Sequence, residues 1–268
     1  MKKNKKKIVC LQTTSSRDPQ KNINMLEELF AKISSKADLI CLPECVAVFT
    51  DKRKEINFFL EKYRESFFNL ISYQAKKKKS SILVGSVPEK LNDSKFVNRS
   101  YVFDDRGFQK SRYDKINLFD VNLSNTENYF ESKNYASGKK LIVSDLVWGK
   151  LGMSICYDLR FPNLYRNLGK KGAHFFSIPA AFTFTTGKAH WHSLIRARAI
   201  ENGCFVFAPA QCGVHDNGRR TYGHSMIVNP WGKVLVEAKY DKKQVISKTI
   251  NISEVQEYRK KIPSMTKF

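Results

Sequence analysis

The sequence contains one stretch that decides the local fold, GKLGMSICYDLRFP at residues 149–162. Apolar and small residues alternate up to Ile155, which predicts a buried strand that ends at Cys156. Pro162 opens a predicted helix, and residues 173–178 form the next apolar strand. The order strand, helix, strand indicates an α/β sheet. Cys156 then lies at the carboxyl end of a strand, where ligands collect in open sheets of this kind.

The surroundings of Cys156 bear on whether it is reactive. A lone cysteine is more often a small buried apolar residue than a reactive group. Tyr157, Asp158 and Arg160 follow it directly and suit the wall of a polar pocket. A thiol near a helix N-terminus also ionises more readily. A functional role for Cys156 therefore requires partner groups from other parts of the chain.

The composition describes a soluble globular protein of 268 residues, with 42% hydrophobic and 27% charged residues. No segment approaches the roughly 18 consecutive apolar residues of a membrane span. The lysine-rich start is followed by an apolar run too short for a secretory signal, so we expect a cytoplasmic protein. Six widely spaced cysteines then predict reduced thiols, and Cys41 and Cys45 lack further ligands for a zinc site.

The net charge of +22 comes from 47 Lys and Arg residues against 25 Asp and Glu residues. A balance this basic permits loose association with nucleic acid or anionic membranes. The lysines are spread over the whole chain, however, and no nucleic-acid-binding motif accompanies them. We expect a lysine-biased solvated surface with no specific nucleic acid and no membrane as partner. A basic binding protein without enzymatic activity stays open as the alternative from another class.

Two further reactive residues directly follow predicted strands. Residues 38–42 form an apolar strand that leads into Glu44. A predicted hairpin joins residues 97–103 to residues 108–113, and its second strand leads into Lys115. Each residue alone is more often an exposed surface group. Together with Cys156, however, they supply a proton carrier, a cation for an oxyanion and a nucleophile.

The rest of the chain predicts a single α/β domain. Amphipathic periodicity predicts one long helix over residues 54–77, and the polar residues 116–138 predict a long irregular loop. No linker rich in Gly, Ser or Pro and no internal repeat divides the sequence. We expect one domain over residues 1–268, with a core at about 8–250 and a terminal helix at about 252–262.

The segments that carry the three reactive residues resemble the signatures of the nitrilase superfamily of carbon-nitrogen hydrolases. They are LPE at 42–44, YDKINLFD at 113–120 and GMSICYDLRFP at 152–162. Later segments are similar to the Nit branch, whose members include deaminated glutathione amidase and ω-amidase. These segments are HW at 190–191, RARAIEN at 196–202, APAQCG at 208–213, YGHSM at 222–226 and PWG at 230–232.

The resemblance implies a four-layer α-β-β-α sandwich of the nitrilase type, assembled as a homodimer or higher homo-oligomer. It implies an amidase that hydrolyses a small, carboxylate-bearing amide through a cysteine thioester, without metal or organic cofactor. Deaminated glutathione is the substrate we expect, in a metabolite-repair role. An ω-amidase acting on α-ketoglutaramate or succinamate is the alternative within the branch.

The resemblance also implies roles for the site residues. Cys156 is expected to be the nucleophile, and Glu44 the general base and then acid. Lys115 and the backbone N–H of Tyr157 are expected to stabilise the oxyanion. Glu131 matches the second glutamate that holds the lysine in this superfamily, and Glu127 is a competing candidate for that role.

Other residues bear on substrate specificity. Arg160 has two interpretations. Its guanidinium either donates two hydrogen bonds to a substrate carboxylate or forms a structural ion pair. The residues after the predicted strand at 173–178 either line the pocket or pack as part of an ordinary loop. These residues are Ala181, Phe182 and Thr183.

One position departs from the Nit pattern. His192 follows His190-Trp191, where the branch usually has Glu. Residues 188–202 are predicted to form a helix, on which His190 and His192 do not share a face. We therefore expect no metal site from this pair.

Two other hydrolase mechanisms remain open. A Cys-His hydrolase would use a histidine as base in place of Glu44. The candidate bases are His174, His190, His192, His215 and His224. A serine hydrolase is disfavoured, because Ser154 and Ser225 both lack the second glycine of the Gly-x-Ser-x-Gly motif.

Overall fold

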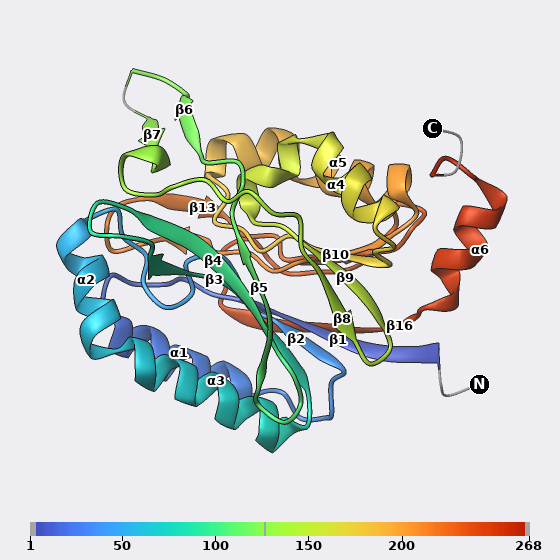
Figure 1. Cartoon of the computed structure of the whole chain (residues 1–268), viewed down its shortest axis with the longest axis horizontal. Coiled ribbons are helices and arrows are strands. Elements are labelled where there is room, and N and C mark those ends of the chain that lie inside the picture. The colour runs from blue at the N-terminus through green and yellow to red at the C-terminus, as the bar shows by residue number, and fades with distance from the viewer. Residues whose placement is uncertain (1–3, 126, 266–268) are drawn as a thin grey trace.

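Two six-stranded sheets form the centre of the computed structural model, which describes residues 4–125 and 127–265 (Figure 1). The first sheet contains β1 (Lys5–Gln12), β2 (Leu39–Cys41), β3 (Ser81–Lys90), β4 (Phe96–Phe103), β5 (Gln109–Asp114) and β16 (Gln244–Asn251). Its strand order is β16-β1-β2-β3-β4-β5. The second contains β8 (Val143–Leu146), β9 (Gly149–Met153), β10 (Phe175–Ser177), β11 (Phe205–Ala208), β14 (Met226–Val228) and β15 (Val234–Glu237). Its order is β15-β14-β11-β10-β9-β8.

Helices cover the outer face of each sheet and so complete the four layers (Figure 1). The helices are α1 (Pro19–Ala31), α2 (Arg53–Lys62), α3 (Arg64–Lys78), α4 (Pro162–Lys170), α5 (Phe184–Asn202) and α6 (Ser253–Lys261). α1 and α3 lie on the first sheet, and α4 and α5 lie on the second. The expected α-β-β-α sandwich is confirmed.

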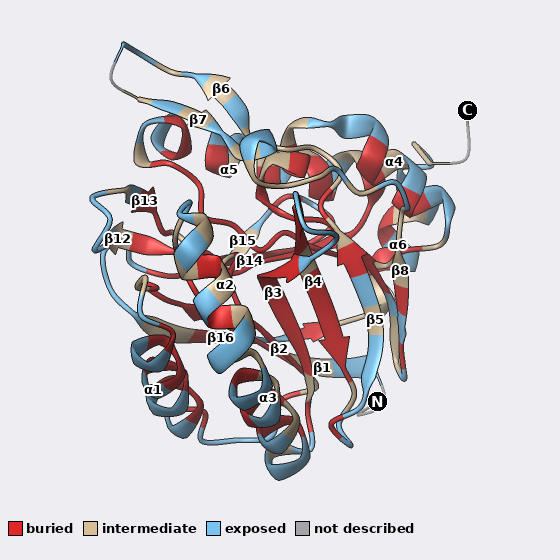
Figure 2. Ribbon diagram, turned by 60° about the vertical axis from the view of Figure 1, so that its left-hand side comes forward, coloured by how far each residue is buried: buried red, intermediate tan, exposed pale blue. Residues whose placement is uncertain are grey.

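Alternation along the strands explains why both faces of the first sheet are buried. In β1, Ile8 and Cys10 pack into the cluster between the two sheets. Val9 and Leu11 point the other way and pack beneath α1 and α3. A strand covered on both faces reads as a continuous apolar run. Figure 2 shows β3 and β4 largely buried, while the outward sides of α1 and α3 are exposed.

The predicted helix over residues 54–77 is wrong in one respect, because two helices occupy this segment. α2 ends at Lys62 and α3 begins at Arg64, with Tyr63 between them at φ −126° and ψ −13°. The break turns the chain so that each helix buries its own apolar side. Phe59 of α2 and Phe67 of α3 still meet edge to face, with ring centroids 6.2 Å apart.

The segment 116–138, expected to be irregular, contains a short hairpin, and a second short hairpin lies at residues 212–222. β6 (Asp120–Asn122) pairs with β7 (Asn128–Phe130), and a 3-10 helix at Glu131–Lys133 follows. β12 (Cys212–Val214) pairs with β13 (Arg220–Tyr222). Figure 2 shows both hairpins on the left-hand side of the molecule, where β6 and β7 extend outward and β13 packs against α5.

The first and last strands of the fold are neighbours. β1 pairs antiparallel with β16 along its whole length, from Lys5 opposite Asn251 to Gln12 opposite Gln244. The terminal helix predicted at 252–262 is confirmed as α6, at Ser253–Lys261. Residues 1–3 and 266–268, which the domain prediction included, lie outside the described residues.

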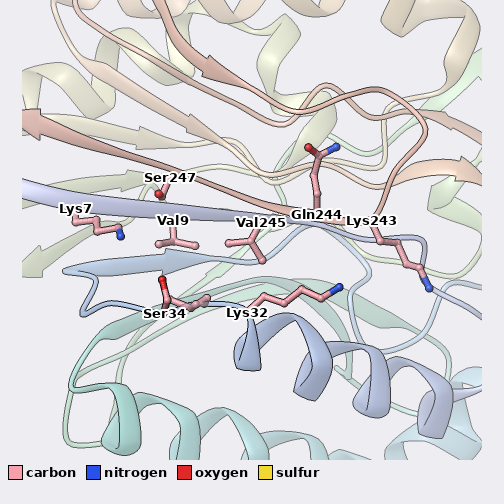
Figure 3. Close-up of a pocket in the computed structure, with 9 residues that line it drawn as sticks. Lys7, Val9, Lys32, Ser34, Lys243, Gln244, Val245 and Ser247 are labelled. Carbon is pink, nitrogen blue, oxygen red and sulfur yellow. The ribbon is translucent and has the colours of Figure 1, made fainter.

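A shallow cavity of about 290 Å³ lies where β1 and β16 meet the segment after α1. Figure 3 shows Val9 and Val245 of the sheet near Lys32 and Ser34. None of the three expected catalytic residues lines this cavity. In the part of the chain that the structure describes, no helix is both long and apolar enough to cross a lipid bilayer.

Candidate active site

A larger cavity of about 490 Å³ brings together the residues singled out in the sequence. Glu44 follows β2, Lys115 follows β5 and Cys156 follows β9, and all three line this cavity. Glu131 lines it as well. Residues from both sheets therefore converge at one end of the sandwich, as expected for groups at the ends of strands.

Cys156 occupies a sharp turn between β9 and the 3-10 helix at Cys156–Arg160. Its φ angle is +47°, a left-handed conformation that residues with a side chain rarely adopt. Its backbone N–H donates to the carbonyl oxygen of Pro179 at 2.9 Å. Tyr157 is one residue further into the helix, so its N–H belongs to the first turn, where N–H groups lack acceptors within the helix.

Asp158 ties the turn at Cys156 to the segment that carries Lys115. Its buried carboxylate accepts hydrogen bonds from the Tyr113 hydroxyl at 2.8 Å and from the Asn117 backbone N–H at 2.9 Å. Burial raises the pKa of Asp158 above its usual range, although these hydrogen bonds oppose the rise. Because Tyr113 and Asn117 flank Lys115, the carboxylate fixes the position of the lysine relative to the thiol.

The Lys115 ammonium group is held between two carboxylates. Its Nζ lies 3.0 Å from Glu44 Oε1 and 2.8 Å from Glu131 Oε2, and its side chain is only 2% exposed. The Asn98 amide donates to Glu44 and to Glu131, at 3.0 Å each. The four groups form one hydrogen-bonded network. Buried charges of this kind are stable only when fully paired.

The two candidates for the second glutamate occupy different positions. Glu131 contacts Lys115 directly and also accepts from the Phe119 backbone N–H at 2.7 Å. Glu127 lies apart and accepts from the Thr185 hydroxyl at 3.0 Å. The structure thus brings Glu131, and not Glu127, to the lysine.

The second oxygen of Glu44 is fixed by the neighbouring loop. Its Oε2 accepts from the Ala181 backbone N–H at 2.8 Å. Gly85 of β3 passes so close that a Cβ atom there would lie 2.0 Å from the Leu42 carbonyl oxygen. Only glycine fits at this position, because any side chain would displace the strand end that carries Glu44.

The environment sets the charge of each group. Burial opposes ionisation of Glu44, but the Lys115 ammonium and hydrogen bonds from Cys156, Lys115 and Ala181 hold the pKa of Glu44 below its usual range. Burial also disfavours the Lys115 ammonium, but Glu131 and Glu44 keep the pKa of Lys115 well above its usual range. Burial and the Glu44 carboxylate raise the pKa of the Cys156 thiol. The resting site therefore holds a thiol, a carboxylate and an ammonium ion.

Of the residues expected to line the pocket, Ala181 does so. Tyr157, Phe182 and Thr183 are not among the lining residues. Thr183 is instead the N-cap of α5, where its side chain accepts from the Thr186 backbone N–H.

Arg160 also lies outside the cavity lining. Its guanidinium contacts His190 Nδ1 at 3.2 Å and stacks over the Phe182 ring, 5.1 Å from the centroid. Among the described residues it forms no salt bridge with a carboxylate, so the structural ion pair expected for it is not seen.

Arg219 is a cavity residue that sequence reasoning missed. It lies between β12 and β13, and its guanidinium packs over the Tyr129 ring at 4.7 Å and the Phe49 ring at 5.3 Å. Its Nη2 donates to the Ala181 carbonyl at 3.0 Å, while its buried Nε has no acceptor among the described residues. A buried donor without a partner is uncommon in proteins.

The alternative catalytic groups lie elsewhere. None of the five histidines lines this cavity, and all five belong to the described residues. Ser154 is buried and hydrogen bonds to Tyr165 and to the Ser177 carbonyl, each at 2.8 Å. Ser225 accepts from the Ala210 backbone N–H at 2.8 Å. Among the described residues, the cavity lining therefore contains neither a cysteine–histidine pair nor a serine–histidine pair.

The four-layer fold, with a thiol, a carboxylate and an ammonium group in one cavity, defines the protein as a hydrolytic enzyme. A family model described as carbon-nitrogen hydrolase matches residues 7–260, and the chain belongs to this family. The resemblance to the nitrilase superfamily is therefore confirmed.

Similar proteins agree with this assignment. A deaminated glutathione amidase of Yersinia enterocolitica is 38% identical over 231 residues, covering 85% of this chain and 81% of that protein. A deaminated glutathione amidase of Synechocystis is 37% identical, and the match covers 96% of this chain and 95% of that protein. The crystal structure of the C. elegans NitFhit protein has a TM-score of 0.90 at 33% identity, covering 99% of this chain and 65% of that one.

Proposed function

We propose that this chain is an amidase that cleaves the amide bond of a small carboxylate-bearing molecule, with Cys156 as nucleophile. The observation that carries the proposal is the convergence of Glu44, Lys115 and Cys156 on one cavity of about 490 Å³. A cavity of this size suits a ligand of a few hundred daltons.

The first half of the reaction forms a thioester. Cys156 Sγ attacks the amide carbonyl carbon, and its proton passes to the Glu44 carboxylate, to which the thiol is hydrogen bonded. The new oxyanion lies between the Lys115 ammonium and the Tyr157 N–H. The carbon–nitrogen bond then breaks, and Glu44 gives the proton to the departing amine. The acyl group stays on sulfur.

The second half restores the enzyme. Glu44 is ionised again and takes a proton from a water molecule. The oxygen of this water attacks the thioester carbonyl carbon. The carbon–sulfur bond breaks, and the proton returns to the sulfur from Glu44. The products are a carboxylic acid, an amine and the free thiol. The roles of Lys115 and Glu131 do not change between the two halves.

Deaminated glutathione is the substrate we propose, and the cations of the cavity support it. This molecule carries a carboxylate at each end, and Arg219, Arg53 and Lys133 all line the cavity. The Arg219 guanidinium lines the cavity and can donate hydrogen bonds to a substrate carboxylate. The relatives from Yersinia and Synechocystis are named for the same substrate. We assign carboxylate binding to Arg219 in place of Arg160.

Product analysis tests the proposal on the purified full chain. Deaminated glutathione, α-ketoglutaramate, succinamate and a simple nitrile are compared, with C156A as the inactive variant and C212A as a control for an unrelated thiol. Cleavage of deaminated glutathione releases a dipeptide amine, whereas the two ω-amides release ammonia. We expect dipeptide release with the highest kcat/KM. Faster release of ammonia would identify an ω-amidase, and no turnover on the whole panel would overturn the proposal.

The proposal includes a homodimer or higher homo-oligomer in the cytoplasm, without a specific nucleic-acid or membrane partner. Family resemblance supports the oligomer, and the six free thiols are consistent with a reducing compartment. Sedimentation velocity tests the assembly, and a monomer at micromolar concentration would contradict it. Salt-sensitive nucleic-acid binding without amide turnover would support the basic binding protein instead.

A further inference from the structure

A cluster of two histidines and one glutamate lies on the second sheet, outside the catalytic cavity. His192 comes from α5, His224 precedes β14, and Glu237 is the last residue of β15. Their ligand atoms all lie within 4.8 Å of one another. His192 Nε2 is 2.9 Å from Glu237 Oε1, and His224 Nδ1 contacts the same oxygen. Three separate elements thus direct potential metal ligands at one point.

The backbone holds His224 in place. Its φ angle is +54°, a left-handed conformation that is costly for a residue with a side chain. The indole N–H of Trp191 donates to the His224 carbonyl oxygen at 2.9 Å. Trp191 is adjacent to His192 in α5, so this bond also fixes the helix relative to His224. The two imidazoles are therefore positioned by the fold and not only by their contact with Glu237.

Two tyrosines surround the cluster. The Tyr222 ring centroid lies 4.3 Å from that of His224 and 6.0 Å from that of His192. Tyr240 stacks on His224 with centroids 6.2 Å apart. Aromatic walls limit the motion of the imidazoles and lower the local polarity. The side chains remain 36% exposed at His192 and 22% at His224, so an ion has access from solvent.

The pairing of Glu237 is unusual for a chain with 47 Lys and Arg residues. Within residues 4–125 and 127–265, Glu237 contacts the two histidines and forms no ion pair with a lysine or arginine. A carboxylate without a permanent cation keeps its charge available for another positive partner. Two imidazole nitrogens and one carboxylate oxygen are a ligand set that Zn²⁺ and similar ions favour.

We propose that His192, His224 and Glu237 bind one divalent transition-metal ion, such as Zn²⁺. Ligand atoms about 2.0–2.2 Å from a tetrahedral zinc ion lie roughly 3.3–3.6 Å apart. The three ligand atoms here lie within 4.8 Å of one another, so small side-chain rotations bring them to that spacing. Water supplies the remaining position. We expected no metal site because His190 and His192 face different directions, but the structure pairs His192 with His224. The bound ion clamps α5 to the β14 and β15 hairpin.

Titration with Zn²⁺ alone tests the proposal on the full chain after treatment with a chelator. Isothermal titration calorimetry is compared for the native chain, H192A, H224N and E237Q, with H190A as the matched control on the same helix. Asn is chosen at position 224 because it tolerates the left-handed backbone. We expect one Zn²⁺ per chain, at least tenfold weaker binding in the three cluster variants and unchanged binding in H190A.

Thermal unfolding gives a second readout. Saturating Zn²⁺ is expected to raise the Tm of the native chain by several degrees and to leave the Tm of H192A unchanged. Circular dichroism without metal checks that each variant is folded. Absence of binding to the native chain, or binding that survives in H192A and H224N, overturns the proposal and leaves the cluster as a set of hydrogen bonds only.

Discussion

In the proposed mechanism, Cys156 and Glu44 divide the chemistry between a neutral thiol and an ionised carboxylate. Burial and the Glu44 charge raise the pKa of Cys156, so the neutral thiol is the favoured form before substrate arrives. Lys115 keeps Glu44 ionised in spite of its burial. The proton must therefore move during the attack itself. This assigns to a glutamate the function that a histidine performs in thiol–imidazole pairs.

Replacing Glu44 with Gln tests this assignment. The amide keeps the size of the side chain but cannot accept the thiol proton, so we expect kcat to fall by about 10³-fold or more. Steady-state kinetics with the preferred substrate gives the measurement, and single His→Ala variants are the comparison. Near-native turnover in E44Q would favour a histidine base.

The pH dependence of kcat/KM follows from the same three groups. The pKa of Glu44 is lowered from 4.5, and the pKa values of Lys115 and Cys156 are raised from 10.5 and 9.0. None of them titrates near neutrality, so we expect kcat/KM to be constant between about pH 6 and pH 9. A bell-shaped pH profile of kcat/KM with one limb near pH 7 would show that a different group controls the reaction.

Arg219 is the residue for which we predict an effect on specificity. R219M removes the guanidinium. Loss of a charged hydrogen bond of about 1.5–3 kcal/mol should raise KM roughly 10- to 150-fold for a carboxylate-bearing substrate. A neutral amide should be affected much less. R160M is the matched control, since Arg160 does not line the cavity. Equal losses on both substrates would indicate a structural role for Arg219.

At the scale of elements, the ends of helices were harder to predict than their cores. The sequence predicts a helix from residue 188, whereas α5 begins at Phe184. The reason is Thr183, whose side chain accepts from the Thr186 N–H and starts the helix earlier than its apolar periodicity indicates. Tyr63 likewise interrupts a pattern that is periodic on both sides of it.

The cap at Thr183 gives a prediction about stability. T183A removes the hydrogen bond to the first turn of α5 and should cost about 1 kcal/mol, which corresponds to a Tm lower by roughly 2–4 °C. Thermal unfolding followed by circular dichroism measures the change. T185A, in the exposed first turn of the same helix, is the control and should have a smaller effect. Equal effects would argue against the cap.

The site was predictable where a residue lies one to three positions after the end of a strand. Glu44, Lys115 and Cys156 each occupy such a position, and the sheet brings strand ends together. Asn98 lies inside β4 and Arg219 lies in a hairpin far along the chain, so neither position indicates a common cavity. Arg99 and Ser100 follow Asn98 in the same strand, so the local sequence did not single out the buried Asn98. Finding Arg219 required the pairing of β12 with β13.

At the scale of the whole molecule, His215 joins segments from distant parts of the chain. Its Nδ1 contacts the Ser15 carbonyl and its Nε2 contacts the Thr221 hydroxyl, each at 2.8 Å. Its ring stacks on Phe49 with centroids 4.0 Å apart. Burial lowers the pKa of His215 from 6.5 to about 4. The imidazole is therefore neutral in the folded protein at neutral pH.

This lowered pKa makes stability depend on pH. Between about pH 6.5 and pH 4 the unfolded chain binds a proton at His215 that the folded chain excludes, so stability falls as pH falls through this window. The loss reaches at most about 3 kcal/mol. Urea unfolding at pH 7, 5.5 and 4.5 measures it. H215Q should be less stable at pH 7 but should lose less on acidification, and an equal loss would contradict the prediction.

The pairing of β1 with β16 has a consequence for how the protein is made. Translation produces β1 first, but its partner on that side exists only after the ribosome has passed Asn251. One edge of the first sheet thus has exposed backbone donors and acceptors throughout most of synthesis, and such edges associate readily with other chains. Nascent chains arrested before β16 should accordingly depend on chaperones, while completed chains should not.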